Sequence, residues 1–167
     1  MTPILAATSK VSAAVAGTAE IPDDELEYVT LQIDDQLFGL PIKDVHEVFS
    51  AVQITTVPLA PAAVRGLLNL RGRVVTAMCL RTLLGMAEGT SRSERMAIGV
   101  EIGGEPFALL VDKIGDVLRL PVETLEANPI HMNIDWQGMS RGVHRLEGRI
   151  LVVLDLAQTI GSERLAA

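Results

Sequence analysis

A chain of 167 residues, 49% of them hydrophobic, is long enough to bury the core of one domain or of two small ones. Its formal net charge of −7 argues against nucleic acid and anionic membranes as partners, and its aromatic content of 3% is too low for base-stacking platforms. The single cysteine, Cys79, excludes an internal disulfide, and no uninterrupted apolar run approaches the roughly 18 residues of a membrane span.

The N-terminal segment predicts a tail ahead of the first strand. Residues 1–17 are rich in Ala and other small residues, but they lack the basic start of a secretory signal, and Lys10 interrupts their apolar part. An acidic cluster follows Pro22. We therefore expect residues 1–25 to form a disordered tail.

The first ordered unit is a predicted β-hairpin. Residues 28–33 alternate apolar and polar side chains, the pair Asp34 and Asp35 marks a turn, and the alternation resumes over residues 38–42. Two alternating segments joined by a two-residue polar turn favour an antiparallel hairpin. The apolar pattern then continues through Val45 towards another strand.

A second hairpin is predicted around a corner at residues 71–73. Two short apolar runs, residues 67–70 and 74–78, flank this corner. The apolar residues that follow have the period of a helix, starting at Leu80, and Gly85 ends the predicted short helix.

Both units occur twice in the chain. Residues 28–48 recur at 97–117 with a constant offset of 69, and residues 65–85 recur at 141–161 with an offset of 76. The second copy is therefore seven residues longer, and the extra length falls in a loop around residues 128–139. Two long copies indicate a duplicated subdomain and not a solenoid.

Each copy supplies about five short strands and one short helix, and such strands close into a small barrel. We predict an all-β fold with short helices, made of two packed five-stranded barrels within residues 26–161. The barrels are expected at about 28–85 and 97–161, with a linker at 86–95 and a C-terminal tail at 162–167. The core is expected at the apolar positions that both copies share: Phe38, Leu40, Leu70, Val74, Phe107, Leu109, Leu146 and Ile150.

No residue pattern in the chain predicts catalysis. His46, His131 and His144 show no ligand spacing with one another or with Cys79, which we expect to be a buried, inert thiol. The nucleotide-binding and nucleophile-elbow glycine motifs are absent from the sequence. We therefore expect no enzyme, no metal site and no cofactor.

The duplication provides an internal comparison between equivalent positions. Where the copies agree, as at Gly72 and Gly148, we attribute the residue to the needs of the barrel. Where they differ, the residues are candidates for partner contact, with ordinary surface variation as the alternative. The differing pairs are Arg71 and Glu147, Asn69 and Arg145, His46 and Gly115, and Arg81 and Ala157.

Three stretches in combination resemble a known family. Asn-Leu-Arg-Gly at residues 69–72 is followed by an apolar strand and by Leu-Arg at 80–81. Phe-Gly-Leu-Pro-Ile at 38–42 and Val-Asp-Lys-Ile-Gly-Asp-Val-Leu at 111–118 complete the pattern. Over about residues 28–161 the chain resembles the CheW family, the coupling proteins of bacterial chemotaxis.

This resemblance implies two five-stranded barrels of SH3-like form and an adaptor without enzymatic activity. It implies that the protein is cytoplasmic and is recruited to receptor arrays at the inner face of the membrane, without direct membrane insertion. There it would bridge the cytoplasmic tips of chemoreceptors to the regulatory domain of the histidine kinase CheA. By position, Val45 and Arg71 resemble residues of the receptor-binding groove, with Glu47, Met96 and Val117 near it.

The chain departs from the family pattern at two positions. Thr76 stands where the family commonly has Pro, and Cys79 where it commonly has Asp. The second copy retains the acid at Asp155, a plausible helix cap, so its loss from the first copy is expected to weaken that helix by about 1 kcal/mol.

A small-molecule-binding protein is the alternative function. Two packed barrels leave a groove between them, and such grooves commonly hold ligands. The scarcity of aromatic residues and of convergent polar groups argues against this alternative.

Overall fold

The computed structural model describes residues 24–50, 53–86, 96–132 and 134–166. Its strands are β1 (Glu25–Ile33), β2 (Gln36–Pro41), β3 (Val45–Ser50), β4 (Val64–Leu70), β5 (Arg73–Cys79), β6 (Met96–Ile102), β7 (Glu105–Val111), β8 (Lys113–Pro121), β9 (Leu125–Glu126), β10 (Ser140–Leu146) and β11 (Arg149–Leu154). Its helices are the 3₁₀ turns η1 (Ile42–Asp44) and η2 (Val122–Thr124) and the α-helices α2 (Leu80–Leu83), α3 (Ile134–Met139) and α4 (Leu156–Ala166).

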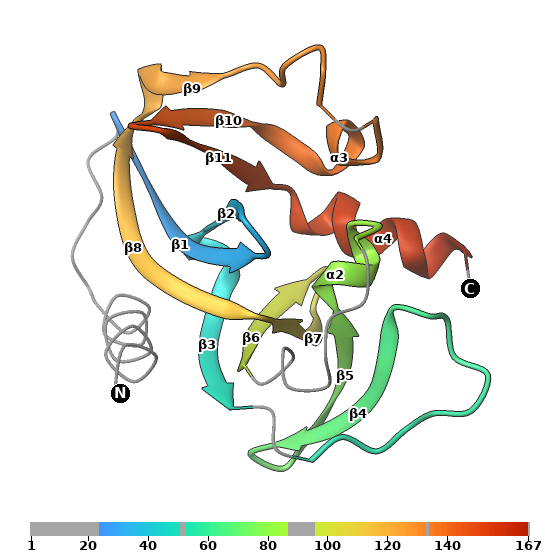
Figure 1. The fold of residues 1–167 in the computed structure, drawn as a ribbon. Coiled ribbons are helices and arrows are strands. Elements are labelled where there is room, and N and C mark those ends of the chain that lie inside the picture. Colours follow the sequence, from blue (N-terminus) through green and yellow to red (C-terminus); the bar gives the residue numbers. More distant parts are fainter. Residues whose placement is uncertain (1–23, 51–52, 87–95, 133, 167) are drawn as a thin grey trace.

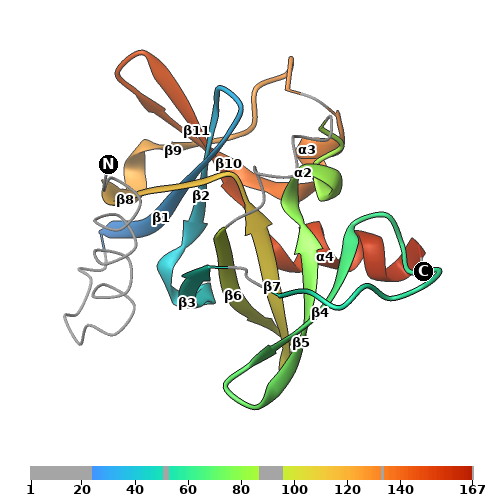
Figure 2. The same ribbon diagram turned by 60° about the horizontal axis from the view of Figure 1, so that its bottom comes forward.

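The strands form two sheets, which confirms the expected all-β fold with short helices (Figure 1). The six-stranded sheet has the order β8-β1-β2-β11-β10-β9, and the five-stranded sheet has the order β3-β6-β7-β5-β4. Helices α2, α3 and α4 gather on one side of the molecule in both ribbon views (Figures 1 and 2). After β7 the chain leaves the five-stranded sheet, and β8 pairs with β1 in the other sheet.

The two repeats exchange hairpins, so the prediction that each repeat forms its own barrel, at about 28–85 and 97–161, is wrong in its strand assignment. The β1–β2 hairpin of the first repeat lies in the sheet of β8, β10 and β11, and the β6–β7 hairpin of the second lies in the sheet of β3, β4 and β5. Alternation along a strand defines its two faces but not the sheet that it joins. The exchange makes each sheet depend on both repeats.

The duplication itself is visible in the pairing register of the strands. Leu31 of β1 lies opposite Phe38 of β2, and the equivalent residues of the second repeat, Val100 of β6 and Phe107 of β7, lie opposite each other as well. The bulge that interrupts the β4–β5 pairing recurs in the β10–β11 pairing. The exchange is reciprocal, because β3 pairs with β6 and β8 pairs with β1, each across a further bulge. The molecule therefore has an internal twofold equivalence of strands.

Buried apolar residues form three clusters. The largest takes residues from both sheets, such as Leu31 of β1 and the equivalent Val100 of β6. The opposite face of each sheet has its own smaller cluster, built around Leu68 and Leu110 in the five-stranded sheet and around Tyr28 and Leu151 in the six-stranded sheet. The sheets therefore share one core and each also encloses a core of its own.

Half of the predicted core residues are confirmed as buried. Phe38, Leu40, Phe107 and Leu109 lie in the core shared by the sheets. Leu70 and Leu146 are half-buried, and Val74 and Ile150 are exposed, at 63% and 39%. The prediction for Val74 and Ile150 was wrong because these residues lie next to the corners of the β4–β5 and β10–β11 hairpins, where the inward face is taken by their neighbours. Those buried neighbours are Val75 and Leu151.

The predicted ends of the ordered region need two corrections. Residues 1–23 of the predicted tail lie outside the described residues, but β1 already begins at Glu25. The predicted C-terminal tail, 162–167, is helical as far as Ala166, because α4 continues through it. Most of the predicted linker, residues 87–95, lies outside the described residues.

The helices at the ends of the two repeats differ in their N-caps. Asp155 accepts a hydrogen bond from the backbone N–H of Gln158 (3.2 Å), as an N-cap does, and α4 has eleven residues. Cys79 precedes α2 with no side-chain cap, and α2 has four residues. The Cys79 side chain is a buried thiol outside any disulfide in the described part of the chain. The first helix was expected to be weak because Cys79 replaces the acid, and in the structure this helix, α2, has no side-chain cap.

The longer loop of the second repeat is attached to the core by Trp136 of α3. Its indole Nε1–H donates to the backbone oxygen of Leu84 (2.8 Å). Its ring meets Phe38 edge to face, with the centroids 5.3 Å apart. One side chain therefore ties this loop to α2 and to the shared core.

Buried polar side chains linked by hydrogen bonds lie on one face of the six-stranded sheet, where the other repeat has apolar side chains. Tyr28 and His144 occupy the positions that Ala97 and Leu68 take in the other repeat. Thr124 Oγ1 donates to the carbonyl oxygen of Pro121 (2.8 Å), so it accepts from Nδ1 of His144 (2.9 Å). In the neutral ring the remaining nitrogen, Nε2, accepts from the Tyr28 hydroxyl (2.9 Å). A neutral His144 with its proton on Nδ1 therefore satisfies both contacts.

We expect His144 to make folding less stable in acid. Burial lowers its pKa below the ordinary value, against an opposing effect of the Glu126 carboxylate. The unfolded chain takes up a proton as the pH falls below about 6.5 and the folded chain does not, so stability decreases from there until the folded histidine also titrates. Chemical denaturation between pH 5 and 7 should show a slope of at most about 1.4 kcal/mol per pH unit. A Tyr28→Phe/His144→Leu double variant should lose this slope, and an unchanged slope would contradict the assignment.

Candidate functional site

The corner of the β4–β5 hairpin presents Arg71 to solvent. Leu70 pairs with Arg73, so Arg71 and Gly72 form the two-residue turn, and both have positive φ, 53° and 82°. Such a turn matches the twist of the two strands, and Asn69 closes it by accepting from the Gly72 backbone N–H (2.9 Å). A positive φ is costly for a residue with a Cβ, so the arginine at this corner has an unfavourable backbone conformation.

Arg71 lies over a groove of about 230 Å³ on the five-stranded sheet. The groove is lined by residues of the β4–β5 hairpin and of β3, β6 and β7. They are His46, Glu47, Leu70, Arg71, Arg73, Val75, Gly99, Val100, Glu101, Pro106 and Phe107. We call it the first groove.

An ion pair spans the first groove. Nη1 of Arg71 lies 3.8 Å from Oε2 of Glu47, with the Arg71 side chain 82% exposed and that of Glu47 26% exposed. Gly99 lies under Glu47, and a Cβ at this glycine would approach Cγ of Glu47 to 3.2 Å. The groove thus has a carboxylate in its wall and a guanidinium at its rim.

The structure brings together two of the five predicted receptor-binding residues, Glu47 and Arg71. Val45 lies two residues before Glu47 on β3 but is buried. Met96 is also buried, at the start of β6, and Val117 is half-buried in the other sheet, on β8. The buried side chains shape the sheet from within, and their role in binding stays a prediction.

Several residues of the first groove are not connected with it by any pattern in the sequence. His46 and Glu101 face each other across the β3–β6 pairing, with Nε2 and Oε2 3.9 Å apart. Arg73 and Pro106 complete its wall. His46 was a candidate because it differs from Gly115, but Glu101 and Pro106 enter through the hairpin exchange, which the sequence pattern did not indicate.

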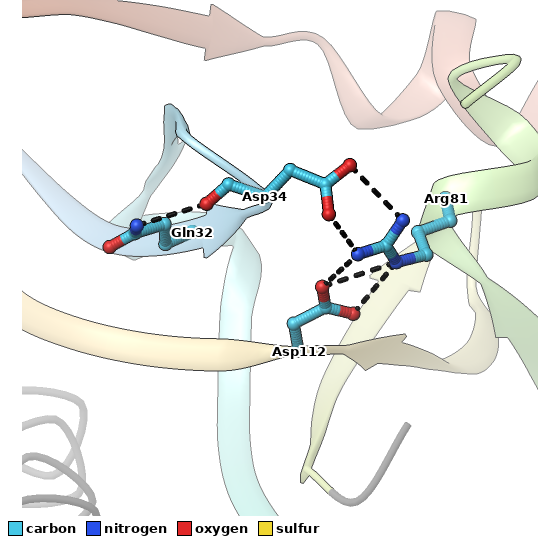
Figure 3. Close-up of polar contacts among 4 residues, drawn as sticks. All are labelled: Gln32, Asp34, Arg81 and Asp112. Carbon is cyan, nitrogen blue, oxygen red and sulfur yellow. Dashed lines mark hydrogen bonds and ion pairs between the residues drawn. The ribbon is translucent and has the colours of Figure 1, made fainter. Parts of the chain in front are cut away.

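Arg81 is not a partner contact, contrary to the candidate role that the comparison of repeats suggested. Its guanidinium lies between the carboxylates of Asp34 and Asp112 (Figure 3), and its side chain is 8% exposed. Nε donates to Asp112 Oδ1 (3.1 Å), and Nη2 to Asp112 Oδ2 (2.6 Å). Hydrogen bonds from Asp112 and then Asp34 raise the pKa of Arg81 above its ordinary value. The residue is part of the framework that joins the repeats.

A separate cavity of about 380 Å³ lies beside β1 and β9. Its walls include Leu26, Tyr28, Leu125 and Val153, with Arg141 at the polar side. Small-molecule sites commonly measure about 300–1,000 Å³, so this cavity is where the alternative function would be located. Across the described ranges, no three His, Cys, Asp or Glu side chains gather closely enough to hold a metal ion.

None of the helices within the described residues has the length and apolar character needed to cross a membrane.

Comparison with known proteins identifies the family. Residues 27–164 match the family model of the CheW-like domain. The chain is 28% identical to the chemotaxis protein CheW of Rhizobium meliloti over 82% of its length and 88% of the relative's, and 26% identical to that of Thermotoga maritima over 81% and 88%. The crystal structure of the scaffolding protein TtCheW from Thermoanaerobacter tengcongensis matches with a TM-score of 0.70 and 30% identity, over 78% of this chain and 88% of that one. The chain belongs to the CheW family, a non-enzymatic family of chemotaxis scaffold proteins.

Proposed function

We propose that this protein is a cytoplasmic adaptor that couples chemoreceptors to the histidine kinase CheA in receptor arrays. The family membership supports the scaffold role. A protein that functions by binding partners needs surface residues that do not pack in its own core. The first groove provides such residues. The receptor assignment depends on one observation. The Arg71 side chain extends over this groove from a turn in which Arg71 has a positive φ, an unfavourable backbone conformation for a residue with a Cβ.

The chemistry of the first groove suits a polar segment of a receptor. A guanidinium offers five donors in a planar fork, which fits carboxylate or carbonyl acceptors on a helix. The ion pair with Glu47 is exposed and is worth only about 0–1 kcal/mol, so Arg71 can exchange this partner for an acceptor of the receptor at low cost. The apolar lining around Leu70 and Phe107 supplies burial for a neighbouring side chain.

Replacing Arg71 by Ala should weaken receptor binding and leave folding almost unchanged. We expect at least about a tenfold loss of affinity for a receptor-tip fragment, which corresponds to 1.4 kcal/mol, because Arg71 is the guanidinium presented at the corner of the groove, whereas Arg73 lies in its wall. The midpoint of thermal unfolding should move little, since the lost ion pair is exposed. Titration calorimetry and circular dichroism on the same variant would measure both effects.

Two variants serve as controls for Arg71. Arg145→Ala removes an exposed arginine that also has one ion pair, to Glu126 at 3.1 Å, and should leave receptor affinity unchanged. Arg71→Gly relieves the positive φ and should change stability by about 0 to +1 kcal/mol while losing receptor binding as Ala does. A lowered melting temperature with full affinity per folded molecule would show that Arg71 is structural instead.

A further inference from the structure

His46 enters the first groove from a β-bulge in β3. In the β3–β6 pairing, Val45 lies opposite Val100, and the next paired residues are Glu47 and Gly99. His46 is therefore an extra residue on β3, with no residue of its own opposite it on β6. A bulge redirects the side chain of such a residue, and the His46 side chain lines the groove.

The first repeat has room for a side chain at this bulge, and the second repeat does not. At the equivalent bulge on β8 the residue is Gly115, and a Cβ there would lie 2.6 Å from Oγ1 of Thr30. The Thr30 hydroxyl is held in place, because it donates to the backbone oxygen of Asp116 (2.5 Å). The repeat equivalent of Thr30 is Gly99, which has no hydroxyl, so the first bulge can hold the ring of His46. Because the same bulge forms around a glycine, the fold does not require this histidine.

The ring of His46 faces the carboxylate of Glu101 on β6, with Nε2 3.9 Å from Oε2. The repeat equivalent of Glu101 is the neutral Gln32, so this pair has no counterpart in the second repeat. The His46 side chain is 55% exposed and that of Glu101 is 39% exposed. In the pair of Arg71 with Glu47, too, the basic side chain is the more exposed member. A partner that enters the groove therefore meets the two basic side chains first.

The protonation state of His46 decides the net charge of the groove. The other charged side chains that line it are two arginines and two glutamates, which balance: Arg71, Arg73, Glu47 and Glu101. Lys43 and Asp44 of η1, directly before β3, balance each other as well. A neutral ring leaves the groove without net charge, and a protonated ring adds one positive charge. Histidine is the side chain that ordinarily changes its charge between about pH 5 and 8.

We propose that His46 is a specificity residue of the first groove, where its protonated ring binds a carboxylate of the receptor segment, in addition to the acceptor that Arg71 binds. This inference rests on the proposed function, in which the first groove holds the receptor, and it names the chemistry of the segment as acidic. An exposed pair of this length contributes little to stability, so the ring can leave Glu101 for the receptor at low cost. The carboxylate complements the positive charge that the protonated ring adds to the groove.

Binding through His46 is linked to proton uptake. A carboxylate that packs against the ring favours its protonated form, so the complex keeps a proton that the free chain releases as the pH rises. Receptor affinity should therefore rise as the pH falls, by at most about tenfold per pH unit for one proton. A residue that only shaped β3 would not produce this dependence.

The test is titration of the purified full-length chain with a receptor-tip fragment at about pH 6 and about pH 8. Wild type is compared with His46→Gln, which is neutral at both pH values, and with His46→Lys, which is positive at both. His131→Gln is the matched control, because His131 is exposed and does not line the groove. The buried His144 is unchanged in every variant, so its effect on stability is common to all of them. Thermal unfolding at both pH values confirms that each variant is folded.

We expect wild type to bind the fragment at least about threefold more tightly at the lower pH. His46→Gln should bind at both pH values as wild type does at the higher one, and His46→Lys should bind at both as wild type does at the lower one. His131→Gln should keep the pH dependence of wild type. The inference is overturned if wild type binds equally at both pH values, or if His46→Gln keeps the dependence. A wild-type chain that does not bind the fragment at either pH overturns the proposed function, and the inference falls with it.

Discussion

Replacing Arg81 by Ala is expected to lower the free energy of unfolding by about 3–5 kcal/mol, the cost of leaving one member of a buried ion pair without its partner. Asp112 has a side chain that is 17% exposed and would keep its negative charge next to an empty space. Asp34, at 56%, is more exposed and would be hydrated. The loss therefore comes mainly from Asp112.

The position of the Arg81 network explains why this loss should affect the whole molecule. Asp34 lies in the turn between β1 and β2, which belong to the six-stranded sheet, and Asp112 follows β7 of the five-stranded sheet (Figure 3). Arg81, at the start of α2, binds both. The network thus holds together two segments that the hairpin exchange places in different sheets.

Urea denaturation of Arg81→Ala, with two matched variants, would measure the effect. Asp34→Asn should cost only about 0–1 kcal/mol, because the carboxylate is exposed and Asn tolerates the positive φ at this turn. Asp112→Asn in the Arg81→Ala background should recover at least about 1 kcal/mol by removing the unpaired charge. A loss below about 1 kcal/mol for Arg81→Ala would mean that water replaces the guanidinium around Asp112.

The sequence predicted the local elements of the fold but not their assembly. Alternation, turn residues and the repeat located both pairs of hairpins, and the spacing of the repeat in the sequence reappears in the β1–β2 and β6–β7 registers. The exchange of hairpins was missed because the two copies have the same pattern. Nothing in that pattern distinguishes pairing within a copy from pairing between copies.

The misplaced core residues have a related cause. Val74 and Ile150 are apolar in both copies, which indicated burial, yet both lie beside a hairpin corner and are exposed. An apolar residue at the same position in both copies shows only that both copies tolerate it there. At a hairpin corner that extends beyond the sheet, even a β-branched residue is exposed to solvent. The alternation resumes correctly one residue later, at Val75 and Leu151.

The candidate site was predicted in part. The resemblance to the family selected Glu47 and Arg71, which the structure places 3.8 Å apart. Comparison of the repeats selected Arg71 and Glu147 as differing positions, and both lie exposed at equivalent hairpin corners. The same comparison misassigned Arg81, because its partners Asp34 and Asp112 lie 47 and 31 residues away and local patterns do not show contacts at that distance.

The fold and the adaptor role are connected through the hairpin exchange. The first groove takes Glu47 and Arg71 from the first repeat and Gly99, Glu101 and Pro106 from the second. A disturbance in either repeat therefore reaches the groove. Phe107, which is buried in the shared core and also lines the groove, is the most direct example.

Phe38→Ala and Phe107→Ala are each expected to cost about 3–5 kcal/mol, because each removes a buried ring from the core shared by the sheets. The cost should be higher for Phe38, whose ring is fully buried and also meets Trp136 edge to face, a contact worth about 0.5–1.5 kcal/mol beyond burial. Losses of this size approach the whole stability of a domain, so the measurement is urea denaturation with Leu in place of Ala as the milder variant.

The pair also separates core packing from groove shape. Phe107 lines the first groove, and Phe38 does not. Phe107→Leu, measured where it is fully folded, should therefore weaken receptor binding, whereas Phe38→Leu should lose stability with little change in affinity for either partner. Tryptophan fluorescence offers an independent readout, because Trp136 is the single tryptophan and should respond to Phe38→Leu far more than to Phe107→Leu. Equal fluorescence changes in the two variants, together with equal losses of stability, would contradict the different surroundings assigned to the two rings.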